Sequence, residues 1–309
     1  MRTASGPADL GGDQVEGLHA VHELLASGKR RVRALWVAQD LAGHEPLLGT
    51  VMLARRQQVP VQLKSSEALA SAARTAAPQG VVAWAQPVQA FSLAELLAAE
   101  VPGAGGTGAE GTGAEGTGPP AFLVVLDGVT DPGNFGSLLR TAACAGATGV
   151  VIARHRSAPL TPAALKSAAG AVEKVPIAVV AGIPAALQQL AKAGVWTVGL
   201  DPAGPTDLWQ TSLLDAPVAL VLGSEGTGIS HLARQRCDVL ARIPQSRALE
   251  SLNVAAAGAV ACFEVARQRR AREGGASPAA TGPATARASV APRGRKSPGN
   301  QPGRRRSGA

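Results

Sequence analysis

Residues 243–254 run Ile243-Pro-Gln-Ser-Arg-Ala-Leu-Glu-Ser-Leu-Asn-Val254 and join a β-like segment, through a polar loop, to an Ala-rich helix. Two further polar loops come earlier in the chain, each after an apolar run: residues 131–140 (DPGNFGSLLR) and residues 222–230 (LGSEGTGIS). All three place small or polar side chains at the ends of strands or helices, where ligands bind in open α/β sheets. Together they predict one ligand site.

The carboxyl-terminal half alternates apolar strand-like runs with helical patterns. Strands are expected at 121–126, 149–153, 175–180, 195–200, 217–222 and 239–243. Helices are expected at 134–146, 161–169, 183–193, 229–235 and 251–270. This alternation predicts an α/β fold with a parallel sheet and right-handed crossover connections.

The remainder of the chain divides by composition. Apolar spacing predicts a helix from Val15 to Leu25 that ends at Gly28. The segments that follow alternate in type, with strands expected at 34–38, 59–63 and 81–85 and helices at 45–57 and 66–75. We therefore predict five parts: a disordered terminus 1–14, a small α/β domain 15–100, a GTGAE-repeat flexible linker 101–120, a larger domain 121–272 and a disordered basic tail 273–309.

Bulk composition narrows the class of protein. The chain has 309 residues, 46% hydrophobic and 17% charged, and no apolar run approaches the roughly 18 residues of a membrane span. The amino terminus has no apolar signal segment, so a cytoplasmic protein without membrane contact is expected. Cys144, Cys237 and Cys262 form no C-x-x-C pair, which disfavours a disulfide framework or a zinc ribbon and suggests small apolar fillers.

Charge points to a polyanionic partner such as nucleic acid, because the net charge is +8 and the isoelectric point is near 10.2. Most of this charge lies in the tail, where eight Lys or Arg residues follow position 271 against Glu273 alone. The rest of the chain is close to neutral. The tail is either a solubilising appendage or an electrostatic tether to RNA, and we favour the tether.

In the first loop, Asn134 is a candidate helix cap and Arg140 follows nearly two turns later in an otherwise apolar helix. Taken alone, a simple cap with a solvent-facing arginine is an equally good interpretation. In the third loop, Ser251 is a candidate cap for the final helix, Leu252 offers an apolar contact, and Asn253 offers both a donor and an acceptor.

In the second loop, Gly223-Ser-Glu-Gly-Thr-Gly228 lets the backbone approach a ligand closely and places Glu225 among glycines. Ile229 stands where a phosphate-binding P-loop needs Lys, and the glycines run G-x-x-G-x-G instead of the dinucleotide pattern G-x-G-x-x-G. A nucleotide-dependent dehydrogenase or NTPase is therefore disfavoured. Taken alone, the motif is also explained by a tight turn before a helix.

Taken together, 131–142, 220–229 and 243–255 resemble the three signature motifs of the SpoU/TrmH RNA ribose 2'-O-methyltransferases of the SPOUT superfamily. Upstream, 16–21 (EGLHAV) and 79–82 (QGVV) are similar to the RNA-binding domain of the group that methylates a guanosine of 23S rRNA. The resemblance covers roughly residues 15–270. One departure is Pro78, where the family often has His before Gln-Gly-Val.

The resemblance implies a SPOUT domain with a trefoil knot, preceded by a small L30e-like α/β RNA-binding domain, in a homodimer whose active site spans the subunit interface. It implies S-adenosylmethionine as cofactor, with backbone contacts to the adenosine from Gly223, Ile243 and Leu252, and no metal. The catalytic residues that it implies are Asn134, Arg140, Glu225, Ser251 and Asn253.

The implied reaction is methylation of a ribose 2'-hydroxyl in RNA, most specifically in 23S rRNA. Arg140 is better suited to stabilise a developing alkoxide or to orient a phosphate than to act as a general base, since a guanidinium keeps its proton. Two alternatives stay open at this point: a tRNA ribose methyltransferase, and a non-catalytic RNA-binding or ribosome-assembly factor. The presence of Asn134, Arg140, Glu225 and Asn253 disfavours the non-catalytic alternative.

Overall fold

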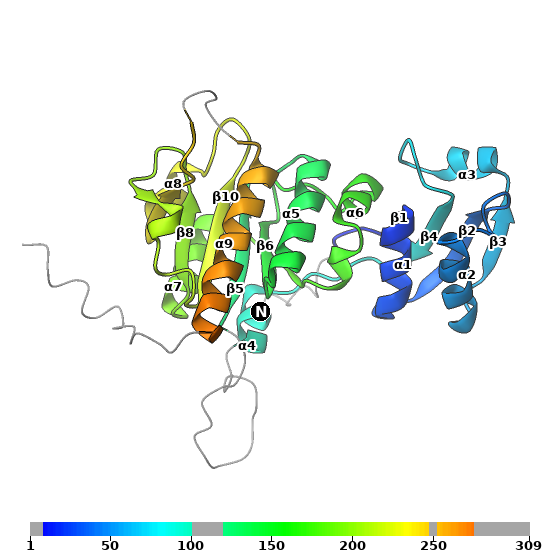
Figure 1. Ribbon diagram of the computed structural model, residues 1–309, viewed down its shortest axis with the longest axis horizontal. Coiled ribbons are helices and arrows are strands. Elements are labelled where there is room, and N and C mark those ends of the chain that lie inside the picture. The colour runs from blue at the N-terminus through cyan, green and yellow to red at the C-terminus, as the bar shows by residue number, and fades with distance from the viewer. Residues whose placement is uncertain (1–8, 101–119, 247–251, 275–309) are drawn as a thin grey trace, which may run out of the picture.

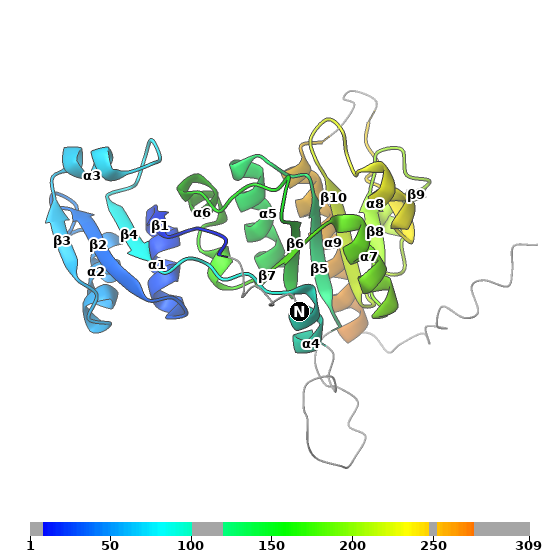
Figure 2. The same ribbon diagram turned by 180° about the vertical axis from the view of Figure 1, so that it is seen from behind.

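The computed structural model describes residues 9–100, 120–246 and 252–274 (Figure 1). The segments predicted as a disordered terminus, a linker and a disordered tail lie mostly outside these residues, and so does Ser251. Two sheets organise the described chain. A small sheet with its helices forms an amino-terminal unit, and a larger sheet forms a carboxyl-terminal unit beside it (Figure 1, Figure 2).

The small sheet has the strand order β1-β4-β2-β3, in which only β2 and β3 are parallel. Its strands are β1 (Gln14–Glu16), β2 (Val32–Ala38), β3 (Val61–Lys64) and β4 (Val81–Ala85). Its helices are α1 (Leu18–Ser27), α2 (Leu47–Arg56) and α3 (Ser66–Ala72). Alternate residues of β4 explain the packing: Val81, Ala83 and Ala85 join the cluster that contains α1 and α2, while Val82 packs with Leu69 of α3.

The large sheet has the order β7-β6-β5-β10-β8-β11-β9 and every neighbouring pair is parallel. Its strands are β5 (Phe122–Asp127), β6 (Gly149–Ala153), β7 (Ile177–Val180), β8 (Trp196–Leu200), β9 (Thr206–Asp207), β10 (Val218–Gly223) and β11 (Val239–Arg242). Residues of β5 and β10 are buried throughout, as expected for central strands covered on both faces. The predicted α/β fold with a parallel sheet is confirmed.

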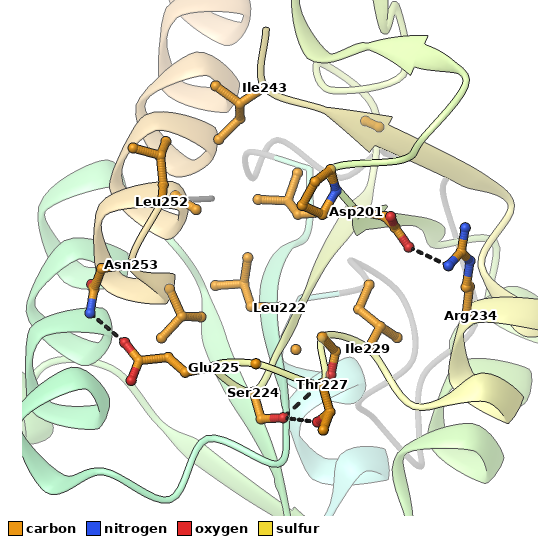
Figure 3. Close-up of a pocket in the computed structure, with 18 of the residues that line it drawn as sticks. Asp201, Leu222, Ser224, Glu225, Thr227, Ile229, Arg234, Ile243, Leu252 and Asn253 are labelled. Carbon is orange, nitrogen blue, oxygen red and sulfur yellow. Dashed lines mark hydrogen bonds and ion pairs between the residues drawn. The ribbon is translucent and has the colours of Figure 1, made fainter. Parts of the chain in front are cut away.

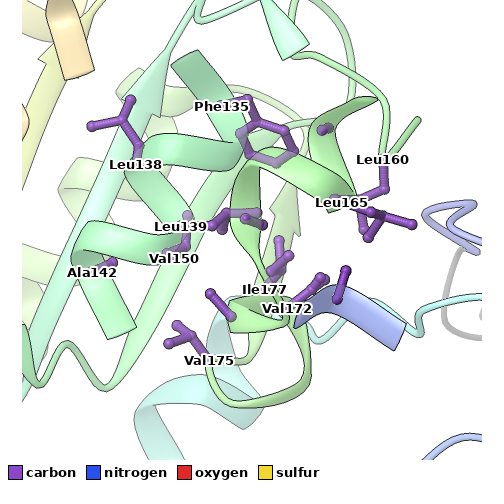
Figure 4. Packing of buried hydrophobic residues seen from close by; sticks show 14 of the residues in the cluster. Phe135, Leu138, Leu139, Ala142, Val150, Leu160, Leu165, Val172, Val175 and Ile177 are labelled. Carbon is purple, nitrogen blue, oxygen red and sulfur yellow. The ribbon is translucent and has the colours of Figure 1, made fainter. Parts of the chain in front are cut away.

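Helices cover both faces of the large sheet. They are α4 (Leu93–Glu100), α5 (Pro132–Ala145), α6 (Pro162–Ala168), α7 (Ile183–Lys192), α8 (His231–Arg236) and α9 (Val254–Gly274), with two short 3-10 turns, η1 (Ala171–Glu173) and η2 (Leu208–Gln210). Figure 4 shows α5 on one face, where Leu139 lies beside Val150 of β6. The other face is covered by α4, α7 and α8, whose apolar residues contact Leu123 and Val125 of β5.

Small residues allow α9 to approach α5 closely. A side chain at Gly258 would place its Cβ 2.3 Å from Leu138 Cδ2 and 3.0 Å from Leu222 Cδ1. A larger residue at Gly258 would force the Leu138 side chain to move, so Gly258 favours the close contact between α9, α5 and β10. This agrees with the close backbone approach expected from the Ala-rich sequence after Asn253.

Two details of the predicted helices are wrong. The helix expected from Val15 starts only at Leu18, because residues 14–16 pair with β4 as β1 and Gly17 turns the chain at φ +90°. Asn134 is not the cap of α5. Asp131 takes that position, and its side chain accepts a hydrogen bond from the Asn134 backbone N–H at 2.7 Å, with Pro132 in the first turn.

Helix α4 was not predicted from the sequence, and it packs on the large sheet. Leu93 and Leu96 join the cluster formed with β5 and β6, and Phe91 bridges to Ala178 of β7. Residues 91–100 therefore belong structurally with the carboxyl-terminal unit, although they precede the segment 101–120. Within the described ranges, no helix is long and apolar enough to cross a membrane.

Candidate functional site

The second and third loops singled out in the sequence meet at the carboxyl ends of β8, β10 and β11, beside the start of α9. They line a pocket of about 430 Å³, a volume in the range of small-molecule sites (Figure 3). The first loop does not line this pocket and reaches its edge through the hydrogen bond between Asn134 and Asn253. One part of its lining is apolar: Leu200, Leu222, Ile229, Ala241, Ile243, Leu252, Val254 and Ala257. The polar part comprises Asp201, Ser224, Glu225, Thr227, Arg234, Gln245 and Asn253.

The loop after β10 is folded back on itself. Ser224 and Gly228 exchange two backbone hydrogen bonds of 3.0 and 3.1 Å, and their turn is closed by a 2.5 Å contact between the Ser224 and Thr227 hydroxyls. Gly226 and Gly228 have φ of +84° and +66°, in the left-handed region. At Gly223 a Cβ would lie 2.0 Å from the Gly228 carbonyl carbon, so this close return of the chain requires glycine.

Three of the predicted catalytic residues meet through Asn253. Its Nδ2 donates to Asn134 Oδ1 at 3.0 Å and to Glu225 Oε1 at 2.5 Å. Its Oδ1 accepts from the backbone N–H groups of Ala255 and Ala256 at 2.8 and 3.2 Å, which makes Asn253 the cap of α9. The cap therefore orients the amide so that its two N–H bonds tie the first and second loops together at the pocket's edge.

Ile243 and Leu252, predicted to supply backbone contacts to a ligand, both line the pocket with Gly223. Leu252 is 40% exposed, which is high for a leucine, and it lies at the mouth beside Ile243 (Figure 3). Apolar side chains and open main chain at one end, with a carboxylate and amides at the other, suit a ligand that has a flat heterocycle and a polar tail. The residues present therefore fit a nucleoside-containing cofactor.

One part of the pocket was missed from the sequence. Asp201 follows β8 directly and forms an ion pair with Arg234 of α8, with Asp201 Oδ2 and Arg234 Nη1 separated by 2.9 Å. Asp127, at the end of β5, does not line the pocket; it is 3% exposed and accepts from the Ser230 backbone N–H at 2.8 Å. Both aspartates end predicted parallel strands, so their positions were the signal that could have revealed them.

Arg140 does not line this pocket. It lies two turns along α5 from Asn134, on the side that faces α6, in a separate cleft of about 670 Å³. Its side chain is exposed and makes no hydrogen bond or ion pair with any described residue. A single chain therefore brings together Asn134, Glu225 and Asn253 but leaves Arg140 apart, while Ser251 lies outside the described residues.

The cysteines differ from one another. Burial, together with the negative charges of Asp238 and Asp127, raises the pKa of the Cys237 thiol to about 12, and burial raises the pKa of Cys262 to about 12. These two agree with the expected apolar fillers. Cys144 does not, because it is exposed on α5.

Family models match both units. A model described as the SpoU rRNA Methylase family matches residues 121–263, and one described as RNA 2'-O ribose methyltransferase substrate binding matches residues 14–91. The 23S rRNA (guanosine-2'-O-)-methyltransferase RlmB of Pseudomonas putida is 36% identical over 259 residues, which cover 84% of this chain and 97% of that protein. The chain belongs to the SpoU rRNA methylase family. The protein of the same name from Pseudomonas aeruginosa is also 36% identical, over 83% of this chain and 97% of its own length.

Solved SpoU structures share the fold. An AdoMet-bound rRNA methyltransferase from Sinorhizobium meliloti superposes with a TM-score of 0.64 at 25% identity, over 82% of this chain and 86% of that one. AviRb of Streptomyces viridochromogenes, a SpoU methyltransferase in complex with AdoMet, gives a TM-score of 0.65 at 24% identity, over 83% and 90%. The motifs quoted from the sequence therefore identified the family correctly.

Proposed function

We propose that this chain transfers a methyl group from S-adenosylmethionine to the 2'-hydroxyl of a ribose in RNA, and that its substrate is a guanosine of 23S rRNA. The observation that carries the proposal is the convergence of Asn134, Glu225 and Asn253 at the edge of a pocket with an apolar end. Support for the substrate comes from relatives that carry the name 23S rRNA (guanosine-2'-O-)-methyltransferase. This chain matches nearly the whole length of each of them.

The pocket is the proposed cofactor site. We infer that the adenosine lies against Leu222, Ile243 and Leu252, with main-chain groups of the Gly223 loop and of the segment before α9 recognising the base. Main-chain recognition needs no acidic side chain for the ribose of the cofactor. When bound, S-adenosylmethionine supplies an electrophilic methyl group on a sulfonium, and no metal is expected in the reaction.

We propose that three polar residues of this chain position the target ribose. Asn253 is held by the α9 backbone, and through its Nδ2 it orients both the Asn134 amide and the Glu225 carboxylate. We propose that these groups align the target ribose with the methyl group, since alignment of the reacting atoms provides much of the acceleration in such displacements. Ser251, two residues before Asn253, is proposed to act in the same group.

Arg140 is proposed to act across a homodimer interface. Its planar guanidinium would stabilise the oxyanion that develops on the 2'-oxygen, or orient the adjacent phosphate. The support is its position: it lies outside the pocket of its own chain, is exposed and has no partner within the described ranges. Phe263 of α9 is 47% exposed, as expected if part of this helix packs on a second copy.

Mixed dimers test this arrangement. Arg140→Ala and Asn253→Ala chains are each expected to be inactive as homodimers. If Arg140 completes the pocket of the other subunit, mixing the two chains creates one site with both groups intact, and methylation returns. Activity that stays at background in heterodimers verified by mass would show that Arg140 acts within its own chain, or not at all.

The activity is tested by mapping ribose methylation across all RNA from cells with and without the gene. We expect loss of one methyl group on a 23S rRNA guanosine, and calorimetry should show S-adenosylmethionine binding by the purified protein. Loss of a tRNA modification would instead support the tRNA alternative. A folded protein that binds no cofactor would favour a non-catalytic RNA-binding factor.

We further propose that the carboxyl-terminal segments form a trefoil knot, and that the chain divides into an RNA-binding domain from residue 15 and a methyltransferase domain that ends near residue 272. The knot is supported by the resemblance and by β10 lying between β5 and β8, although β8 precedes it in the chain. Because residues 91–100 pack on the large sheet, we place the domain boundary near residue 90, before the expected 100. A crystal structure of the dimer with cofactor would test both proposals.

A further inference from the structure

The cleft that contains Arg140 lies between the two units. Thr75 lines it from the amino-terminal unit, and α5 and α6 line it from the carboxyl-terminal unit. We call it the inter-unit cleft. Its lining residues are Thr75, Ser137, Arg140, Thr141, Ala163, Lys166 and Ser167. They include two cations and four hydroxyl groups, but no carboxylate.

Most of the hydroxyl protons in the cleft are already used. Thr75 donates to the buried carboxylate of Glu16 at 2.5 Å, and Ser167 donates to the Gly133 carbonyl at 2.9 Å. The Ser167 hydroxyl already donates its proton to the Gly133 carbonyl. In its 3.0 Å contact with the Ser137 hydroxyl, Ser167 is therefore the acceptor and Ser137 the donor. Arg140 and Lys166 are therefore the main groups left to bind an incoming molecule, and both favour an anion.

The width of the cleft is set by contacts between the units on both sides of α6. Lys166 Nζ donates to the Ala77 carbonyl, which ties α6 to the loop that carries Thr75. At η1, Arg30 Nε donates to both carboxylate oxygens of Glu173 at 3.1 Å, and the two side chains are only 8% and 5% exposed. A charged pair that is buried and bidentate holds its partners in one geometry.

Close packing at two glycines adds to this rigidity. A Cβ at Gly170, which has φ +87°, would lie 2.2 Å from Glu23 Cβ of α1, and one at Gly17 would lie 3.1 Å from Lys166 Cγ. The units therefore approach more closely than any other residue at Gly170 would permit. Arg140 is exposed and Lys166 is half-buried in the cleft, whose walls are held together by these contacts.

We propose that the inter-unit cleft binds the RNA strand next to the target nucleotide, and that Lys166 contacts a backbone phosphate there. This rests on the proposed function, in which Arg140 serves the ribose that is methylated. Lys166 lines the same cleft as Arg140, so a strand that presents its ribose to Arg140 would bring a neighbouring phosphate to Lys166. RNA is favoured as the occupant because the free groups are cations and the cleft has no acidic side chain.

The test is Lys166→Gln in the full-length protein, with unmodified 23S rRNA transcribed in vitro as the probe. Gln keeps an N–H donor, on a side chain one bond shorter, but cannot neutralise a phosphate. We expect the slope of log affinity against log salt to fall by about one, the KM for RNA to rise several-fold, and turnover at saturating RNA to change little. Lys166→Arg should restore the slope, and the affinity for S-adenosylmethionine should not change.

The matched control is Lys192→Gln, which removes an exposed lysine from α7, far from the cleft. A second variant, Thr141→Glu, places a carboxylate in the cleft and should weaken RNA binding about tenfold in low salt. If Lys166→Gln folds and keeps the slope of the Lys192→Gln protein, and Thr141→Glu binds RNA normally, the cleft proposal is overturned.

The two proposals can fail separately. If the wild-type protein methylates 23S rRNA and Lys166→Gln leaves the salt slope unchanged, the proposal for the cleft is rejected and the proposed methyltransferase activity stands. If the salt slope depends on Lys166 but the protein binds no S-adenosylmethionine and transfers no methyl group, the cleft stands as an RNA-binding site and the proposed methyl transfer is rejected.

Discussion

The pocket and the contact between the two units depend on different interactions. The pocket depends on main chain, glycine and apolar side chains: its β10 loop turns back so closely that Gly223 admits no Cβ. The contact between the units depends on charge, since Arg30 and Glu173 are buried together and Arg30 also donates to the Gly12 and Gln86 carbonyls at 2.8 and 2.9 Å. Close approach at glycine therefore matters at both sites, and the contact between the units adds a buried charge pair.

The largest effect is expected when the buried charge pair is broken. Glu173→Ala leaves the Arg30 guanidinium buried without its carboxylate and should lower the free energy of unfolding by about 4 kcal/mol. Denaturant unfolding measures this change. The control is Glu23→Ala, which removes the partly exposed Glu23–Lys174 ion pair of 2.9 Å and should cost about 1 kcal/mol or less. Equal losses in the two variants would mean that the buried pair does not hold the units.

At the pocket, Gly223→Ala should act through shape alone. Its Cβ would lie 2.0 Å from the Gly228 carbonyl carbon, so the loop must move, with a cost of about 3 kcal/mol and loss of S-adenosylmethionine binding. Thermal unfolding and calorimetry measure the two effects. Gly182→Ala is the control, because Gly182 has extended φ of −167° and open space around it. Normal cofactor affinity in Gly223→Ala would refute the pocket assignment.

Arg140→Lys tests whether Arg140 acts in turnover without contributing to S-adenosylmethionine binding in the pocket. Lysine keeps the charge but loses the planar fork, so turnover should fall about 100-fold while S-adenosylmethionine affinity and stability stay unchanged. Single-turnover methylation measures the loss. Full activity in this variant would show that the guanidinium is not required, and weakened cofactor binding would place Arg140 in the pocket itself.

The smallest effect concerns the reactivity of the three cysteines. With pKa values of about 12, Cys237 and Cys262 should hardly react with iodoacetamide at pH 8 in the folded protein, whereas exposed Cys144 should be labelled. Peptide mapping by mass spectrometry distinguishes the three sites, and all should react in urea. The raised pKa values also mean that stability contributed by these thiols is lost as pH rises from 9 toward 12. Rapid labelling of Cys237 in the folded protein would contradict its raised pKa.

Much of the fold was predictable because six of the seven strands of the large sheet are short apolar runs separated by helical patterns. The exception is β9 (Thr206–Asp207), which is polar and was not predicted. The strands with the strongest pattern, such as β6 at Gly149–Ala153, were predicted with the observed bounds. Helix α4 and strand β1 were missed because their local sequences are ambiguous and their partners lie far along the chain. Leu93 and Leu96 of α4 pack on β5 and β6, across the segment 101–119.

The helix caps also show that sequence alone does not determine which residue takes a given role. Asp131 and Asn134 both have the chemistry of a helix cap, and only the backbone geometry selects Asp131. At the other end of the site, Asn253 caps α9 and contacts residues 119 and 28 positions away. Capping preference is local and visible in sequence, whereas the second role of Asn253 depends on contacts across the fold.

The order of amino acids by itself determined the alternation of strands and helices, the three loops at their ends and the family to which the chain belongs. These features follow from local periodicity and from residue types at short spacing. Only the tertiary structure decided that Asn134, Glu225 and Asn253 meet, that Asp201 and Arg234 join their pocket, and that Arg140 faces another cleft. Those relations depend on which strands become neighbours and how helices pack, because a sheet brings together residues that the chain keeps far apart.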